Sequence, residues 1–268
     1  MSGHVLTQGR PPIAARHLRP DAWWALPATV VVVLGAFIGY STWAALQNAH
    51  YYAAPYLSPF YSPCLATSCL HPTFGWGFPD VQLPWFGVVS PAFLILWGPG
   101  LFRLTCYYYR KAYYRSFWLA PPACAVPDVK GYTGETRLPL FFQNFHRYAW
   151  YVAVIFIGLL TWDALLAFRF PTPGGGLELG VGVGTLVMWA NVVLLAGYTF
   201  SCHSCRHLCG GAVDVFSKAP GRYRVWRFIS RLNGKHAHFA WLSLFSVGLA
   251  DLYIRLVSMG IIRDVRIF

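Results

Sequence analysis

Three thiols and two imidazoles lie close together at the end of one apolar segment of this 268-residue chain. The string Cys202-His203-Ser204-Cys205-Arg206-His207-Leu208-Cys209 follows the apolar stretch Val181–Phe200. Cysteine and histidine are the side chains that bind zinc, haem iron and iron–sulfur clusters. Packing alone does not require so many of them at one boundary, so the string predicts a redox metal site.

Helical geometry would bring these side chains together. On a helix that turns about 100° per residue, Cys202, Cys205 and Cys209 fall within a band of roughly 60°. His203 and His207 are four residues apart and share a neighbouring face. If the helix continues through this segment, we expect the thiols and imidazoles to point into one space between helices. The alternative is that single members pack as small apolar side chains, Cys209 above all.

The composition places these residues in a membrane protein. Hydrophobic residues make up 56% of the chain and charged residues only 11%, and the mean hydropathy is +0.45. That leaves too little polar surface for a soluble globule. The formal charge of +12 does not indicate nucleic-acid binding, because Lys and Arg are confined to segments between the apolar stretches, as expected of cytoplasmic loops.

A transmembrane helix needs about 20 mostly apolar residues. Five stretches qualify: Trp23–Leu46, Phe86–Tyr107, His146–Phe168, Val181–Ser201 and His236–Val257. We therefore predict an all-α, polytopic protein with five transmembrane helices, located in the cytoplasmic (inner) membrane. Its parts would be a cytoplasmic N-terminal arm (1–22), a membrane anchor domain (23–258) and a C-terminal tail (259–268).

The distribution of basic residues predicts the orientation. Gln47–Trp85 and Pro171–Gly180 contain no Lys or Arg, so both should face outside, whereas the N-terminal arm and the second and fourth loops are basic and should face the cytoplasm. The N-terminus is then cytoplasmic and the C-terminus outside. Arg255, Arg263 and Arg266 in the last segment oppose this rule, and we accept one short exception.

The outer loop contains two cysteines that we expect to form a disulfide, Cys64 and Cys69, because thiols oxidise outside the cytoplasmic membrane. Cys106 and Cys124 belong to the reducing side, where we expect them to be inert. Asp251 and Arg255 are four residues apart on the fifth span, which favours an ion pair along the helix.

Three helix ends meet at one membrane boundary in this topology. His146 opens the third span from the cytoplasmic side, the Cys202–Cys209 string closes the fourth there, and His236 and His238 open the fifth. The combined donors allow several cofactors. Zinc would accept two Cys and two His, but such sites usually brace small soluble loops. Haem needs axial histidines and does not explain clustered cysteines, whereas a Rieske-type [2Fe-2S] cluster uses both residue types.

Three strings at these helix ends resemble one family. They are Asn144-Phe145-His146-Arg147-Tyr148, Cys202-His203-Ser204-Cys205-Arg206-His207 and Leu232-Asn233-Gly234-Lys235-His236-Ala237-His238. They are similar to the single-chain membrane anchor of actinobacterial, mycobacterial-type succinate dehydrogenase (respiratory complex II). The resemblance covers the chain from Trp23 to Val257.

The resemblance implies a five-helix anchor that docks two soluble partners. One is a flavoprotein subunit with bound FAD, and the other is an iron–sulfur subunit with further clusters. Electrons would pass from succinate to a membrane quinone, either menaquinone or ubiquinone. Anchors of this kind often carry haem b, but the group that this chain resembles uses a Rieske-type [2Fe-2S] cluster. Direction of turnover, lipid contacts and any higher oligomer are left open.

The resemblance also implies ligands from among these residues. Cys202 and Cys205 are the preferred thiolates, with Cys209 as a further candidate. The imidazoles come from a set of four, left unranked: His146, His203, His207 and His238. Two alternatives stay open, namely an anchor that binds haem b and a structural anchor without a cofactor.

Five side chains near these strings are candidates to contact the quinone: Arg206, His207, Trp226, Trp241 and Tyr151. Donors already in place would stabilise the negative charge that builds on the quinone oxygens. The alternative for the aromatic residues is the belt at the lipid headgroups. For Arg206 it is a contact with lipid phosphate or a partner protein.

Overall fold

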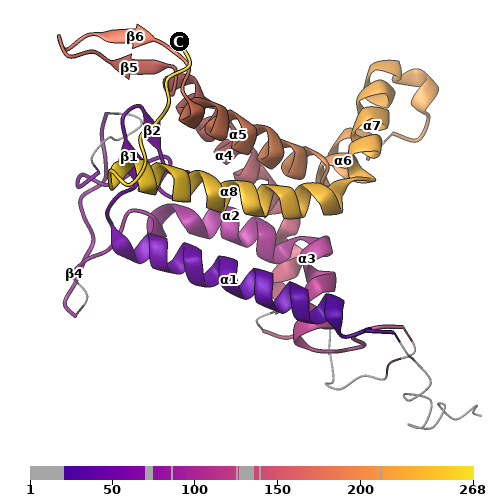
Figure 1. Cartoon of the computed structure of the whole chain (residues 1–268). Helices are drawn as coiled ribbons and strands as arrows, with labels where there is room; N and C mark the ends of the chain where they lie inside the picture. The colour runs from indigo at the N-terminus through magenta and orange to yellow at the C-terminus, as the bar shows by residue number, and fades with distance from the viewer. Residues whose placement is uncertain are drawn as a thin grey trace, which may run out of the picture.

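Long apolar helices dominate the architecture, because a chain in lipid must satisfy its backbone hydrogen bonds within itself. The computed structural model describes residues 21–69, 75–85, 87–124, 126, 136–138, 140–211 and 213–268. The long helices run side by side, with short hairpins at one end of the bundle and smaller helices at the other (Figure 1). The mostly helical prediction is confirmed.

Four segments in the described part of the chain are long and apolar enough to cross a membrane: Ala25–Gln47, Phe141–Leu166, Val183–Phe200 and His236–Ser258. They correspond to helices α1 (Ala25–Gln47), α4 (His146–Leu166), α5 (Val183–Phe200) and α8 (His236–Ser258). The prediction of these four spans was correct to within a few residues.

The second predicted span is shorter than expected. Helix α2 covers Phe93–Thr105, 13 residues, or about 20 Å at 1.5 Å per residue, which is less than a hydrocarbon core of about 30 Å. The strands β3 (Gln82–Leu83) and β4 (Gly87–Val88) pair in the stretch where we expected the helix to begin. The bounds Phe86–Tyr107 were therefore wrong, because hydropathy does not register the turn before Phe93.

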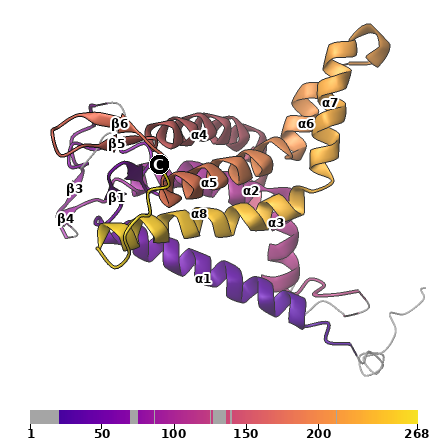
Figure 2. The ribbon, with the colours of Figure 1, turned by 45° about the horizontal axis from the view of Figure 1, so that its top comes forward.

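Shorter elements connect the long helices: β1 (Tyr52–Ala53), β2 (Tyr56–Leu57), α3 (Tyr107–Ala112), the π-helix η2 (Tyr113–Phe117), the short helices η4 (Leu140–Phe145) and η5 (Phe216–Lys218), β5 (Arg169–Pro171), β6 (Leu177–Leu179), α6 (His203–Gly210) and α7 (Pro220–Asn233). The strands pair as antiparallel hairpins, β1 with β2 and β5 with β6. Figure 2 shows α6 and α7 projecting from the bundle at the end opposite these hairpins.

Small residues let the central helices approach closely. A Cβ atom at Gly98 would lie 2.9 Å from side-chain atoms of Val152 and Phe156, so α2 packs directly against α4. A Cβ atom at Gly197 would lie 2.6 Å from the Phe239 ring, where α5 meets α8. Close packing of this kind is typical of membrane helices, and it draws the ends of α2, α4, α5 and α8 together.

Buried charged side chains join helices at the end of the bundle where the strand hairpins lie, which we call the hairpin end. Arg255 Nε lies 3.3 Å from Asp251 Oδ2, and both side chains are almost fully buried. Arg255 also donates to the carbonyl oxygens of Ala49 and Ala44 at 2.8 and 3.3 Å. Cys64 and Cys69 of the same end are joined by a disulfide bond. The expected ion pair along α8 is confirmed, and it ties α8 to the end of α1.

Two of the three arginines that oppose the predicted orientation form ion pairs. Arg255 is paired with Asp251, and Arg266 forms an ion pair with Glu178 of β6. Pairing with a carboxylate does not remove the exception, because the rule counts basic residues and Asp and Glu contribute little to it. The C-terminal segment therefore remains an exception to the predicted orientation.

We expect Asp251→Asn to destabilise the protein by about 3 kcal/mol, because removing one partner leaves the Arg255 charge buried and unpaired. The midpoint of thermal unfolding, measured in detergent, should fall. Glu178→Gln is the matched control, since that pair is about half exposed and should contribute no more than about 1 kcal/mol. Equal shifts for both variants would contradict the buried-pair interpretation.

Candidate redox-metal site

Two cysteines lie at breaks between helices. The backbone is extended at Cys202, between α5 and α6, with φ −64° and ψ 146°. It is extended in the same way at Cys106, between α2 and α3, with φ −63° and ψ 128°. The expected continuous helix through the Cys202–Cys209 string is therefore wrong. The break separates Cys202 from the face that carries Cys205 and Cys209.

Each of these cysteines faces a histidine at the start of a long helix. His146 Nε2 lies 2.9 Å from Cys202 Sγ, and His236 Nε2 lies 3.3 Å from Cys106 Sγ. We call these two contacts the Cys–His pairs. The histidines open α4 and α8, while the cysteines follow α5 and α2. Four helix ends therefore supply the two pairs.

The second nitrogen of each imidazole is also held. Thr105 Oγ1 lies 2.9 Å from His146 Nδ1, and Ser201 Oγ lies 2.8 Å from His236 Nδ1. Each hydroxyl belongs to the residue just before a cysteine of the pairs. Ligating histidines commonly have such a partner on the second nitrogen, which fixes the ring and its tautomer. Both imidazoles thus present Nε2 toward sulfur.

Aromatic rings pack against both imidazoles. Phe102 stacks on His146 with the ring centres 5.1 Å apart, and Tyr198 stacks on His236 at the same separation. Phe102 and Tyr198 also contact each other. Cys106, Cys202 and His146 are each at most 2% exposed. The Cys–His pairs therefore lie in a closed, water-poor part of the bundle.

The remaining members of the predicted set do not contact the Cys202 sulfur. Cys205 is buried on α6 and interacts with Cys209. His203 and His207 are exposed, with ring centres 4.3 Å apart, and line one open pocket together with His146. His238 is exposed on α8. Of the predicted ligands, the structure brings His146 and Cys202 into direct contact.

Cys106 and His236 were not expected to belong to the site. Cys106 directly follows an apolar stretch, as Cys202 nearly does, and this position at a helix end was the available signal. Its place on the reducing side of the membrane, however, led to the expectation that it is inert. His236 was recognised as opening the fifth span but was left out of the ligand set in favour of His238, two residues further along.

Electrostatics disfavours thiolates on the string itself. Burial raises the pKa of the Cys202 thiol to about 12, and burial beside Cys209 raises the pKa of Cys205 to about 12. Without a cation beside them, both thiols are neutral at pH 7. Because metals bind the thiolate, a bound metal would have to supply the stabilising charge.

The donor set suits two irons better than one ion. Within the residues that the structure describes, no group of three or more His, Cys, Asp or Glu side chains converges as the ligands of a single metal ion. A [2Fe-2S] cluster instead takes two protein ligands on each of two irons. Two thiols and two imidazoles from the Cys–His pairs match that number and chemistry.

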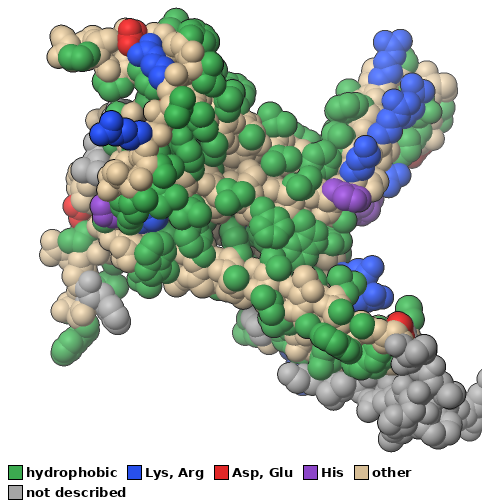
Figure 3. Space-filling model, in the orientation of Figure 1, with side chains coloured by type: hydrophobic (Ala, Val, Ile, Leu, Met, Phe, Trp, Pro, Cys, Tyr) green, Lys and Arg blue, Asp and Glu red, His purple; other side chains and the backbone are tan. Residues whose placement is uncertain are grey.

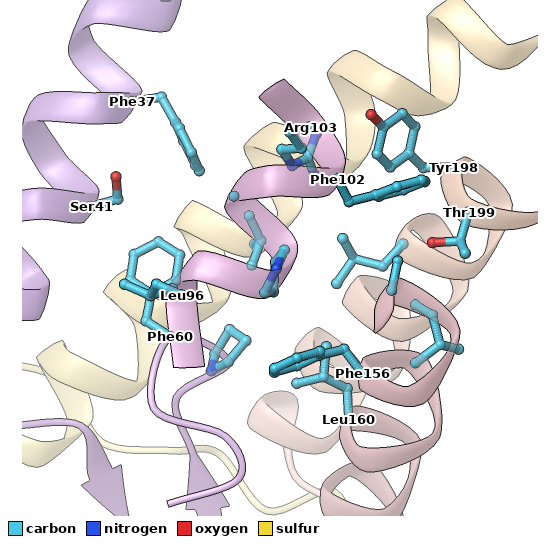
Figure 4. Close-up of a pocket in the computed structure, with 17 residues that line it drawn as sticks. Phe37, Ser41, Phe60, Leu96, Phe102, Arg103, Phe156, Leu160, Tyr198 and Thr199 are labelled. Carbon is cyan, nitrogen blue, oxygen red and sulfur yellow. The ribbon is translucent and has the colours of Figure 1, made fainter. Parts of the chain in front are cut away.

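A cavity of about 180 Å³ lies beside the pairs, enclosed by α1, α2, α4 and α5. Its walls are mostly apolar, with Phe60, Leu96 and Phe156 at the end away from the pairs (Figure 4). Arg103 and Tyr198 line the other end. The buried phenol oxygen of Tyr198 makes no hydrogen bond within the described residues and lies beside the Cys106 thiol.

The comparisons with known proteins agree on the family. Residues 25–260 match the family of the actinobacterial succinate dehydrogenase subunit SdhC. The chain belongs to this family. It is also similar to a chain of the Mycobacterium smegmatis Sdh1 complex in the apo form, at 45% identity and a TM-score of 0.87, covering 100% of this chain and 99% of the other. No curated protein matches it.

The residues expected to contact a quinone do not form one site in this SdhC chain. Arg206 on α6 packs over the Trp226 ring of α7 at 5.2 Å. Trp241 donates a hydrogen bond to Tyr108 at 2.8 Å, and Tyr151 lies on an exposed face of α4. His207 lines an open polar pocket on α6. Arg206, His207 and Trp226 thus lie near one another at the α6–α7 end, whereas Trp241 and Tyr151 lie apart from them.

We expect a maleimide at pH 8 to modify Cys124 at least about a hundredfold faster than Cys202. Cys124 is exposed, whereas Cys202 is buried and its raised pKa leaves almost no reactive thiolate. Peptide mass spectrometry of the purified SdhC-containing complex measures both rates. Cys209, which is partly buried, should fall between them. Equal rates at Cys124 and Cys202 would contradict the burial described here.

Proposed function

We propose that this SdhC chain is the membrane anchor and electron-transfer subunit of a succinate:quinone oxidoreductase in the cytoplasmic membrane. The observation that carries the proposal is the meeting of two thiols and two imidazoles at four helix ends. Electrons would arrive from a soluble iron–sulfur subunit, itself reduced through a flavoprotein subunit, and leave on a membrane quinone. The end with the pairs would face the cytoplasm, and α2 with its flanking segments would make the fifth span.

Cys106 and Cys202 would hold a Rieske-type [2Fe-2S] cluster as thiolates, with His146 and His236 as neutral imidazoles. When bound, such a cluster accepts and releases one electron at a higher potential than a cluster with four thiolates. The hydroxyls of Thr105 and Ser201 would hold the rings in place.

The geometry favours this cluster over haem b. Haem iron would bind at Nε2 of the histidines, but Nε2 of both His146 and His236 is next to a cysteine sulfur. The porphyrin plane would have to displace both thiols. A structural anchor without a cofactor is disfavoured too, since it gives no reason for two buried thiols to face two imidazoles, one buried and one partly buried.

The cavity beside the pairs would bind the quinone headgroup. A quinone is a flat apolar ring with two oxygens that accept hydrogen bonds. The cavity has apolar walls and, at the end near the pairs, donors from Arg103 and Tyr198. Donors at that end would stabilise the charge that develops on a quinone oxygen during reduction. This location replaces the scattered set expected from the sequence.

The docking surface for the soluble subunits would be the projecting α6–α7 end. Figure 3 shows Lys and Arg side chains along α7 and histidines at its base. An open pocket there is lined by polar side chains that include Arg147, His203, His207 and Arg222. A basic surface suits an acidic partner surface. It also lies on the same end of the bundle as the pairs, as electron entry requires.

We expect Cys106→Ser and Cys202→Ser to remove the cluster, while Cys205→Ser and Cys209→Ser keep it. Iron and acid-labile sulfide analysis of the purified complex, with low-temperature EPR, measures the loss beyond the clusters of the partner subunits. The ligand variants should lose at least about 90% of the signal, because each iron needs both of its protein ligands. Loss in the Cys205 variant with retention in the Cys106 variant would contradict this assignment. A sharp haem band in the absorption spectrum would favour haem b.

We expect Gly100→Leu to raise the KM for quinone by about tenfold, because Gly100 lines the cavity and the new side chain would occupy part of it. Neither Gly100 nor Gly158 has a heavy atom within 4 Å of an added Cβ. Gly158→Leu, outside the cavity lining, is therefore the matched control and should leave the KM unchanged. Succinate oxidation with a soluble dye as acceptor should be normal in both variants. An unchanged KM in the Gly100 variant would place the quinone elsewhere.

A further inference from the structure

Arg103 of α2 is a partly buried cation that no carboxylate neutralises among the described residues. The ion pairs between side chains of the described residues involve Arg255 and Arg266 instead. Arg103 Nη1 donates to Tyr109 Oη at 2.9 Å and to the Ala240 carbonyl at 3.2 Å, and Nη2 donates to Ser243 Oγ at 3.0 Å. These partners are neutral oxygens. They hold the guanidinium in place without cancelling its charge.

The guanidinium is directed toward the Cys–His pairs. Its carbon atom lies 4.8 Å from the centre of the Tyr198 ring, and the same ring stacks on His236. Cys106 is one helical turn beyond Arg103, and its N–H bonds to the Arg103 carbonyl at 3.2 Å. Figure 4 shows Arg103, Phe102 and Tyr198 together at one end of the cavity. One aromatic ring therefore separates the charge from a proposed ligand.

We infer that Arg103 sets the reduction potential of this centre by keeping one uncancelled positive charge beside the Cys–His pairs. The inference rests on the cluster proposed above. With two thiolates and two neutral imidazoles, the oxidised centre has no net charge and the reduced centre has one negative charge. The redox step moves one electron, given by the partner iron–sulfur subunit, and no bond is made or broken. In a water-poor site a fixed cation favours the reduced form.

The test is an EPR-monitored redox titration of the intact, detergent-solubilised complex. We expect Arg103→Gln to lower the ratio of reduced to oxidised centre by about tenfold at a given ambient potential, which is about 59 mV for a one-electron couple. Arg103→Lys keeps the charge and should stay near the wild-type value. Arg263→Gln is the control, because Arg263 is exposed in the C-terminal segment at the opposite end of the bundle (Figure 1). It should not change the ratio.

A second variant keeps the inference testable if Arg103→Gln does not assemble. Ser243→Asp places a carboxylate next to the guanidinium and cancels its charge while Arg103 stays in place. It should lower the ratio in the same direction. A normal potential in Arg103→Gln, or in Ser243→Asp where only that variant assembles, would overturn the inference and leave Arg103 as a brace between α2 and α8. Absence of a second set of iron and sulfide from the wild-type complex would instead refute the proposed cluster.

Discussion

The buried contacts between thiol and imidazole are the constraint on which the rest of this structure depends. A polar group in lipid or in a dry core is costly unless a partner satisfies it. His146 and His236 meet this requirement on both nitrogens, with a hydroxyl on one side and a sulfur on the other. The partners are crossed, because each helix break supplies a hydroxyl to one histidine and a sulfur to the other. A continuous helix at Thr105 or Ser201 would have pointed these groups along separate faces.

The rest of the bundle positions those four helix ends. Close packing at Gly98 fixes α2 against α4, and close packing at Gly197 fixes α5 against α8. At the hairpin end, the buried Asp251–Arg255 pair joins α8 to the end of α1, and Ser58 adds a hydrogen bond to the same carboxylate. The two ends thus serve different purposes. The hairpin end joins the helices through buried polar contacts, and the opposite end brings the Cys–His pairs close together.

Hydropathy and charge predicted much of the fold, but the predicted ligand set included only one of the two Cys–His pairs, His146 with Cys202. The starts of α4 and α8 were predicted at His146 and His236 because each histidine stands where a basic loop ends and a long apolar stretch begins. Both features can be read from the local sequence. The break at Cys202 was missed, since an apolar stretch followed by Cys and His also fits a continuing helix. Cys106 was missed because its partner, His236, is 130 residues away. A contact of that kind depends on which helices pack together, which periodicity does not encode.

Uncancelled charge marks the functional end of the molecule. At the hairpin end, Arg255 is held by a carboxylate, so its charge strengthens the fold without creating a field at a distance. Arg103 is equally well hydrogen-bonded but only to neutral oxygens, so its field extends into the surrounding core. Retaining such a charge in a partly buried place costs stability, because the lost hydration is not offset by an opposite charge. A charge kept at that cost is best explained by something nearby that becomes negative, and electron transfer through the Cys–His pairs would create it.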